Sequence, residues 1–514
     1  RSYNTRAIYA NQMFRLLKTF GERHEINAFL GYEYDERRVW DSSGQSSNMI
    51  PGNEVLSGGA SDHNVEGAKT EEKNAAYIFN ANYTLDHKYL FQASIRRDGS
   101  SRFGSNKRWA NFWSLGAGWN MHEEEFLKPY TFINELKPRV SYGITGNQPS
   151  GAYEWTTKLS SVEEYGSEVA LYSNYQGNPN LSWEETGSLD FGLDMRFFDR
   201  VNITFDAYLK KVKNLLYLRH LTAVTGYNRQ TANDGKLENK GFEITITPEI
   251  IKTKDWYWDV SLNLGYNKNK ITYLPDADDL AFQSVAVGYP YYNFYMREWA
   301  GVDPMTGGPL WFIRDEATGE KTATSNYNQA TRVLLDASPS PKINGGVTTS
   351  LTWKDLSFNA VFTFSSGAKI YNGRRAGALD RDAERWSQPA MKLAKGWSRW
   401  EKPGDIATHP QLIAGGNNSA SNESTRYLEN GDYFKMKTIS VAYSLPKKWV
   451  TSLGVSDLSV SLGGENLFTI TKYSGDDPEI LLSDRFNGTT TPTPNSGQLY
   501  PTVRRFTLGL NLKF

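Results

Sequence analysis

The sequence predicts an all-β fold, a transmembrane antiparallel β-barrel. Three observations carry this prediction. Apolar and polar residues alternate, the alternating segments run for about ten to fifteen residues, and short connections alternate with long ones. A strand that crosses a bilayer needs about nine to eleven residues, whereas soluble strands average about five or six. The segments therefore suit a barrel in a membrane better than a soluble sandwich or propeller.

Composition narrows the possible functions. The 514 residues include 57 Lys and Arg against 57 Asp and Glu, so the formal net charge is zero. Because there is no excess of basic residues, the charge balance does not favour a nucleic-acid partner. The absence of cysteine excludes disulfides, thiolate metal sites and a cysteine nucleophile. No two of the six histidines have metal-ligand spacing on one short element, so we expect neither a metal nor another cofactor. Aromatic residues make up 14% of the chain, which is typical of a membrane barrel with rings of aromatic side chains at both membrane–water interfaces.

The alternation is clearest at the C-terminus. Phe506, Leu508 and Leu510 are separated by Thr507 and Gly509. Successive side chains of a strand point to opposite faces. The pattern therefore predicts that Leu510 faces lipid and that the next residue, an asparagine, faces the lumen.

Fifteen segments show this pattern, at approximately 3–19, 24–40, 74–85, 88–98, 109–122, 136–147, 183–197, 201–217, 236–250, 256–270, 342–354, 356–368, 432–444, 457–472 and 503–514. A single-chain bacterial barrel has an even number of strands. We therefore expect the chain to be the C-terminal part of a larger barrel, with an odd number of strands and several hundred residues before Arg1.

The connections are of two kinds. Short ones include 21–24, 86–88 and 198–200. Between them lie six long ones, at 41–73, 149–182, 218–235, 271–341, 369–431 and 473–502. Short turns on one side and long loops on the other are typical of an outer-membrane barrel, whose long loops are extracellular. We also expect one or two loop helices within 379–401.

Eight motifs then carry a family resemblance. They are RRDGSSRFG at 96–104, KPRVSYGITGNQ at 137–148, GNPNLSWEET at 177–186, NKGFEI at 239–244, AGVDPMTGGPLW at 300–311, YLENGDYFKMKTISVAYSLP at 427–446, ENLFTITKYSGDDPE at 465–479 and YPTVRRFTLGLNLKF at 500–514. Their order and content resemble the C-terminal half of the SusC/RagA family of TonB-dependent outer-membrane transporters.

The resemblance implies a 22-stranded barrel in the outer membrane of a Gram-negative bacterium. It also implies an N-terminal plug and a TonB-engaging segment, neither of which is visible in this sequence. The implied partners are the TonB complex, a SusD-like surface lipoprotein that acts as a lid, and the outer-membrane lipids. The implied function is import of a bulky nutrient, either an oligosaccharide or an oligopeptide.

Candidate ligand-binding residues lie in two of the long connections. They combine flat aromatic rings with hydrogen-bonding groups, which suits sugars and peptides. They are Trp155, Tyr172, Tyr175, Arg374, Arg375, Arg385, Trp386, Trp397 and Trp400. The same side chains could instead form the internal core of each loop, and the charged run at 96–102 could bind an anionic ligand or fix a loop. The terminal Phe514 resembles the signal that barrel-assembly machinery recognises.

No catalytic constellation stands out, so we expect no enzyme activity. Glu184 and Glu185 are adjacent on a predicted strand and point to opposite faces, so they cannot act as the paired carboxylates of a glycosidase. Two other classes remain open from the sequence: a surface receptor or adhesin that binds without import, and a soluble carbohydrate-active β enzyme.

Overall fold

The computed structural model describes residues 1–52, 55–165, 168–275, 285–315, 317–381, 391–413, 416, 418–451, 454–479 and 502–513. Within these ranges it contains fifteen strands of nine residues or more, and each overlaps one of the fifteen predicted segments. No plug domain is evident in the described part of the chain. Close contacts divide the chain into two units. Unit 1 comprises Arg1–Met195, Ala207–Asn239 and Thr272–Pro275, and unit 2 comprises Arg196–Asp206, Lys240–Ile271 and Asp276–Phe514.

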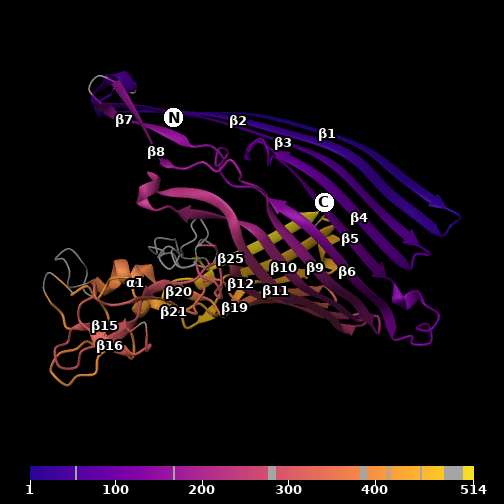
Figure 1. Ribbon diagram of the computed structural model, residues 1–514. Coiled ribbons are helices and arrows are strands. Elements are labelled where there is room, and N and C mark those ends of the chain that lie inside the picture. Colours follow the sequence, from indigo (N-terminus) through magenta and orange to yellow (C-terminus); the bar gives the residue numbers. More distant parts are fainter. Residues whose placement is uncertain are drawn as a thin grey trace. The chain divides into compact units, whose positions relative to one another are not determined.

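Unit 1 is built on a meander of long strands, drawn in indigo to purple in Figure 1. They are β1 (Ser2–Phe20), β2 (His24–Met49), β3 (Gly59–Leu85), β4 (Tyr89–Ser100), β5 (Trp109–Trp119) and β6 (Ile133–Asn147). Each pairs antiparallel with the next. Strand β6 then pairs with β9 (Glu184–Phe197), and β9 pairs with β10 (Val201–His220).

Unit 2 continues the same arrangement of antiparallel neighbours. Its strands include β12 (Trp256–Tyr273), β18 (Ile343–Trp353), β19 (Leu356–Ser366), β22 (Tyr433–Ser444), β23 (Asp457–Glu465) and β25 (Arg505–Lys513). Each of these pairs with the next. Four strands are each divided between the two units: β9, β10, β11 (Arg229–Lys252) and β12.

The strand register gathers the apolar side chains on one face of the sheet. Val441 lies opposite Leu462, which in turn lies opposite Leu508. Leu462 is 60% exposed and Leu508 is 73% exposed, the reverse of what a soluble core requires. An exposed apolar face is the lipid-facing surface of a membrane barrel. Leu510 shares this face, opposite Val460, as the alternation of the last strand predicts.

The tight turns have the backbone geometry of hairpins. Asp86 and His87 both have positive φ between β3 and β4, as do Phe198 and Asp199 between β9 and β10. Consecutive left-handed residues match the twist of the flanking strands, so two-residue turns of this kind join long strands tightly.

Several strands differ from their predicted extents. The segment 41–73 is mostly paired, because Asp41 to Met49 of β2 lie opposite Ala68 to Gly59 of β3. This hairpin is polar on both faces there, so its alternation ends although its pairing continues. The predicted strand 457–472 is broken near Asn466, where φ is positive, and resumes as β24 (Thr469–Thr471).

The other long connections contain short elements, listed here in chain order. They are β7 (Lys158–Tyr165), β8 (Glu168–Tyr175), β13 (Tyr295–Arg297), β14 (Trp299–Val302), β15 (Pro309–Arg314), β16 (Lys321–Thr324), β17 (Arg332–Leu334), β20 (Lys369–Tyr371), α1 (Gly373–Gly377), η5 (Leu379–Arg381), η6 (Thr425–Tyr427) and β21 (Leu428–Asn430). Within the expected helical stretch 379–401, the described residues form only η5.

The remaining short helices are η1 (Leu56–Gly58), η2 (Met121–Glu123), η3 (Ala223–Thr225) and α2 (Lys447–Val450). Among the residues that the structure describes, no helix combines the length and the apolar character needed to cross a membrane.

Buried clusters form where connections pack on themselves, since the strands expose their apolar face. In unit 1 the cluster is Phe103, Phe112, Leu181 and Trp183. Unit 2 contains one cluster beside α1, made of Phe294, Met296, Tyr371, Ala376 and Tyr427, and a second one made of Val450, Val455 and Leu458. Figure 1 shows α1, β15, β16, β20 and β21 gathered beyond the ends of β12 and β19.

Candidate functional site

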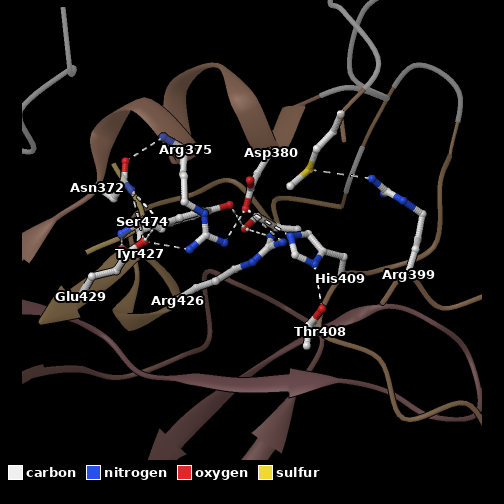
Figure 2. A network of polar contacts seen from close by, with 12 residues as sticks. Asn372, Arg375, Asp380, Arg399, Thr408, His409, Arg426, Tyr427, Glu429 and Ser474 are labelled. Carbon is white, nitrogen blue, oxygen red and sulfur yellow. Dashed lines mark hydrogen bonds and ion pairs between the residues drawn. The ribbon is translucent and has the colours of Figure 1, made fainter. Parts of the chain in front are cut away.

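A buried charge network organises the connection 369–431 in unit 2 (Figure 2). Its centre is Asp380, whose side chain is fully buried. Its Oδ2 atom accepts a 2.9 Å hydrogen bond from Arg375 Nη2. Arg426 Nη2 lies 3.4 Å from the same oxygen, and His409 Nε2 lies 3.6 Å from it. One carboxylate thus faces three nitrogen groups that come from three parts of the connection.

The electrostatics favour the ionised form of Asp380. Burial alone would raise the pKa of this carboxyl, but the imidazole of His409 and the guanidinium groups of Arg375 and Arg426 lower it below its ordinary value. Both arginines also stack on aromatic rings. Arg375 lies 4.3 Å from the ring centre of Trp397, and Arg426 lies 5.0 Å from that of Trp299. Stacking of this kind stabilises a desolvated cation.

Glu429 links the network to the next connection of unit 2. It accepts a 2.9 Å hydrogen bond from Arg375 and a 2.8 Å hydrogen bond from the hydroxyl of Ser474. Asn372 donates to the same carboxylate and caps α1 by accepting from the backbone N–H of Arg375. These polar contacts, among them a hydrogen bond from Asn372 to Ser474, therefore join segments that lie up to 102 residues apart in the sequence.

Thr408, His409 and Asp380 lie in a row that superficially resembles a hydrolase triad. The hydroxyl of Thr408 donates to the carbonyl of Ser398 at 2.9 Å, which leaves its oxygen as the acceptor for His409 Nδ1, also at 2.9 Å. A nucleophile must instead donate its proton to the histidine. His409 is also only 2% exposed, so the row serves packing rather than catalysis.

Four of the residues predicted to bind ligand can be placed around this network. Arg375 and Trp397 belong to it, and the ring of Trp397 lies 4.9 Å from that of His409. Arg374 pairs with Asp476 at the surface. Trp400 donates to the carbonyl of Pro304 at 2.9 Å. Arg385 and Trp386 lie outside the described residues, as does Phe514.

Trp400 also packs against the AGVDPMTGGPLW motif. Gly307 has φ of +72°, and a Cβ placed there would lie 2.4 Å from the indole ring. Only glycine meets both requirements. The aromatic residues of 369–431 that the structure describes thus hold the connection together, which favours the structural interpretation for Trp397 and Trp400.

Unit 1 contains the other three candidates. The hydroxyl of Tyr175 bonds to the carboxylate of Glu154, and it also lies 3.1 Å from the hydroxyl of Thr231. Burial, reinforced by Glu154, raises the pKa of Tyr175 to about 12. Trp155 packs against the Phe103 cluster, whereas Tyr172 is 48% exposed. Of these three, Tyr172 is therefore the best placed to meet a ligand.

Two family-like motifs meet in unit 1. Phe103 of RRDGSSRFG packs against Trp183 of GNPNLSWEET, with tilted rings and 4.8 Å between ring centres. Arg102 pairs with Glu72 at 2.9 Å and donates to the carbonyl of Pro149 at 2.6 Å. Arg96 pairs with Asp98 at 2.6 Å. Arg96 and Arg102 thus already have protein partners, which favours the structural interpretation of this charged run.

A polar pocket of about 420 Å³ lies at the loop end of β12 in unit 2. Its walls present amides, hydroxyls and charges of both signs, which suit a sugar or a peptide. The polar lining residues are Tyr266, Asn267, Lys268, Asn269, Lys270, Tyr289, Asp336, Ser338, Ser340 and Lys342.

The centre of the buried network could not be predicted from the sequence. Asp380, Arg426 and Glu429 are spread over 50 residues of a connection with no periodicity, so nothing in the sequence pairs them. The pocket could not be predicted either, because the residues from 336 to 342 meet β12 only through the folded connection.

The chain is similar to known outer-membrane receptors. The family described as "TonB dependent receptor-like, beta-barrel" matches residues 1–467. TonB-dependent receptor P3 of Formosa agariphila is 31% identical over 542 residues, covering 97% of this chain and 51% of that protein. TonB-dependent receptor SusC of Bacteroides thetaiotaomicron is 29% identical over 473 residues, covering 87% and 44%.

Among solved structures, one described as the RagAB peptide transporter matches with a TM-score of 0.81 at 26% identity, covering 100% of this chain and 56% of that one. The chain therefore spans about half the length of the curated relatives it matches.

Proposed function

The chain belongs to the TonB-dependent receptor β-barrel family of the outer membrane, and we propose from this that it forms most of the barrel wall of a nutrient importer. The cargo is an oligosaccharide or an oligopeptide, too large for passive diffusion. The observation that carries the proposal is the match to the RagAB peptide transporter over the whole chain. Members of this family are transporters and receptors rather than enzymes.

The assembly we propose follows the SusC and RagAB relatives. A SusD-like surface lipoprotein closes over the extracellular end as a lid, and the TonB complex supplies the energy for import. The long connections face outward, and the pocket at the end of β12 and the exposed Tyr172 contact cargo. Arg374, Arg385 and Trp386 are further candidates for cargo contact, and Phe514 is the assembly signal.

Uptake by cells tests this proposal. Cells with the full-length gene should take up a fluorescently labelled oligosaccharide or oligopeptide, and a deletion strain should fall to background. Inactivation of TonB should abolish uptake but leave surface binding, because capture precedes the energised step. Identification of co-purified ligand by mass spectrometry then separates glycan from peptide.

Two results would contradict import. If the deletion leaves uptake of both cargo classes unchanged, the protein is not their importer. If energised wild-type cells bind cargo at the surface and never internalise it, the protein is a surface receptor or adhesin.

A further inference from the structure

A second pocket lies on the lipid-facing side of unit 1, where β6, β9 and β10 run together. Its volume is about 300 Å³. One part of its lining is apolar and is formed by Tyr142, Ile144, Leu189 and Leu209. Tyr142 lies opposite Leu115, which is 57% exposed on the apolar face. The pocket therefore opens toward the hydrocarbon rather than toward the lumen.

Another part of the lining is charged. Lys211 and Lys213 line it and share the face of Leu209, since side chains two apart on a strand point the same way. Both are exposed, and neither makes an ion pair or side-chain hydrogen bond with any residue that the structure describes. Glu185 lines the same pocket, so the charge that faces a ligand is two cations against one carboxylate.

Cations on the outer face of a barrel are tolerated only near the edge of the hydrocarbon. A lysine costs about 2–4 kcal/mol at the bilayer midplane but about 0–1 kcal/mol near the interface. Lys211 and Lys213 lie toward the long connection that follows β10, and away from the tight turn at 198–200. On the proposed topology, in which long connections are extracellular, both lysines lie at the level of the outer-leaflet head groups.

The pocket is also shaped to receive a group beside the lysines. Gly187 of β9 leaves space there, since a Cβ at this position would lie 3.2 Å from the hydroxyl of Tyr142. Tyr142 also borders an apolar groove of about 500 Å³ on the same face, where Ala81, Ala93 and Ala117 leave room between larger side chains. A polar recess thus continues into an apolar one.

We propose that this surface binds a phosphorylated, acylated lipid of the outer leaflet. Lys211 and Lys213 bind its phosphate, and its acyl chains lie along Leu189, Leu209 and the groove beyond Tyr142. Charge complementarity favours a phosphate over a neutral head group, since lysines near a membrane surface attract anionic lipids. The proposal rests on the membrane orientation given above but not on cargo import.

Lipid retention by the full-length protein tests the proposal. Protein extracted from outer membranes in mild detergent is analysed by native mass spectrometry with added bisphosphorylated lipid A, its dephosphorylated form or inorganic phosphate. Wild type should retain lipid A and neither of the other two. The double substitution Lys211→Gln and Lys213→Gln should lower retention about tenfold or more, given the attraction of each lysine to an anionic surface.

Two variants make the test decisive. Lys210→Gln changes the same charge on the opposite face of β10, where this lysine lies over the ring of Tyr208, and should retain lipid A like wild type. Lys211→Arg with Lys213→Arg keeps both charges and should also retain it. Heat-modifiable migration of each variant verifies folding.

The outcomes separate this proposal from cargo import. Equal retention of phosphorylated and dephosphorylated lipid, or undiminished retention in the double glutamine variant, would overturn the lipid site and leave cargo uptake unaffected. Tight binding of inorganic phosphate alone would show a free-anion site and would likewise overturn it.

Discussion

Replacing Leu508 by arginine should prevent most of the protein from assembling as a folded barrel. Leu508 lies on the lipid-facing side of β25, opposite Leu462, and is 73% exposed. An arginine on this face costs about 2–4 kcal/mol near the bilayer midplane. That cost is a large fraction of the stability of a typical protein domain. The measurement is the yield of heat-modifiable barrel in outer membranes that express the full-length protein.

Asn511→Arg is the matched control. Asn511 belongs to the same strand but points to the other face, so the same substitution should leave the yield near that of wild type. Equal losses for the two variants would show that β25 does not separate lipid from lumen.

The substitution Asp380→Asn should loosen the connection 369–431 without unfolding the barrel. It leaves the buried cations of Arg375 and Arg426 without their shared carboxylate. Removal of one partner from a buried ion pair typically costs about 3–5 kcal/mol. Amide hydrogen exchange measures this, because the N–H groups of Asn372 and His409 are bonded within the connection and should exchange at least about a hundredfold faster.

The control for this variant is Asp476→Asn. Asp476 pairs with Arg374, but both side chains are substantially exposed, at 37% and 46%. Exposed pairs contribute about 0–1 kcal/mol, so protection of the same amides should hardly change. Similar acceleration in both variants would mean that Asp380 is not the centre of the connection's stability.

The long strands could be predicted because the membrane imposes a strict two-residue pattern. Where lipid lies on one side and water on the other, as along Trp258 to Tyr266, every second residue must be apolar. The pattern ends where the strands leave the bilayer. Beyond residue 41, β2 and β3 carry polar residues on both faces. Their pairing as far as Met49 and Gly59 therefore shows no alternation of apolar and polar residues in the sequence.

The candidate site was less predictable, because its residues are far apart in the sequence and come together only when the long connections fold. Trp397 could be identified as a candidate from its type and its position in a long loop. That it stacks on Arg375 depends on the path of the chain between them. The partner of Arg426 is a carboxylate 46 residues earlier, and no local rule pairs such distant charges.

The most direct test of the membrane orientation places single cysteines in a chain whose 514 residues contain none. Any cysteine elsewhere in the full-length protein is first replaced by serine. Single cysteines placed in turn along β12, from Trp258 to Tyr266 in the full-length protein, can carry a nitroxide spin label. In lipid bilayers, collisions with oxygen report exposure to hydrocarbon, and collisions with a water-soluble nickel complex report exposure to water. We expect oxygen accessibility to peak at Val260, Leu262 and Leu264, with nickel accessibility peaking at the positions between them. Loss of this two-residue period, or its reversal, would contradict the assignment of β12 as barrel wall between lipid and lumen.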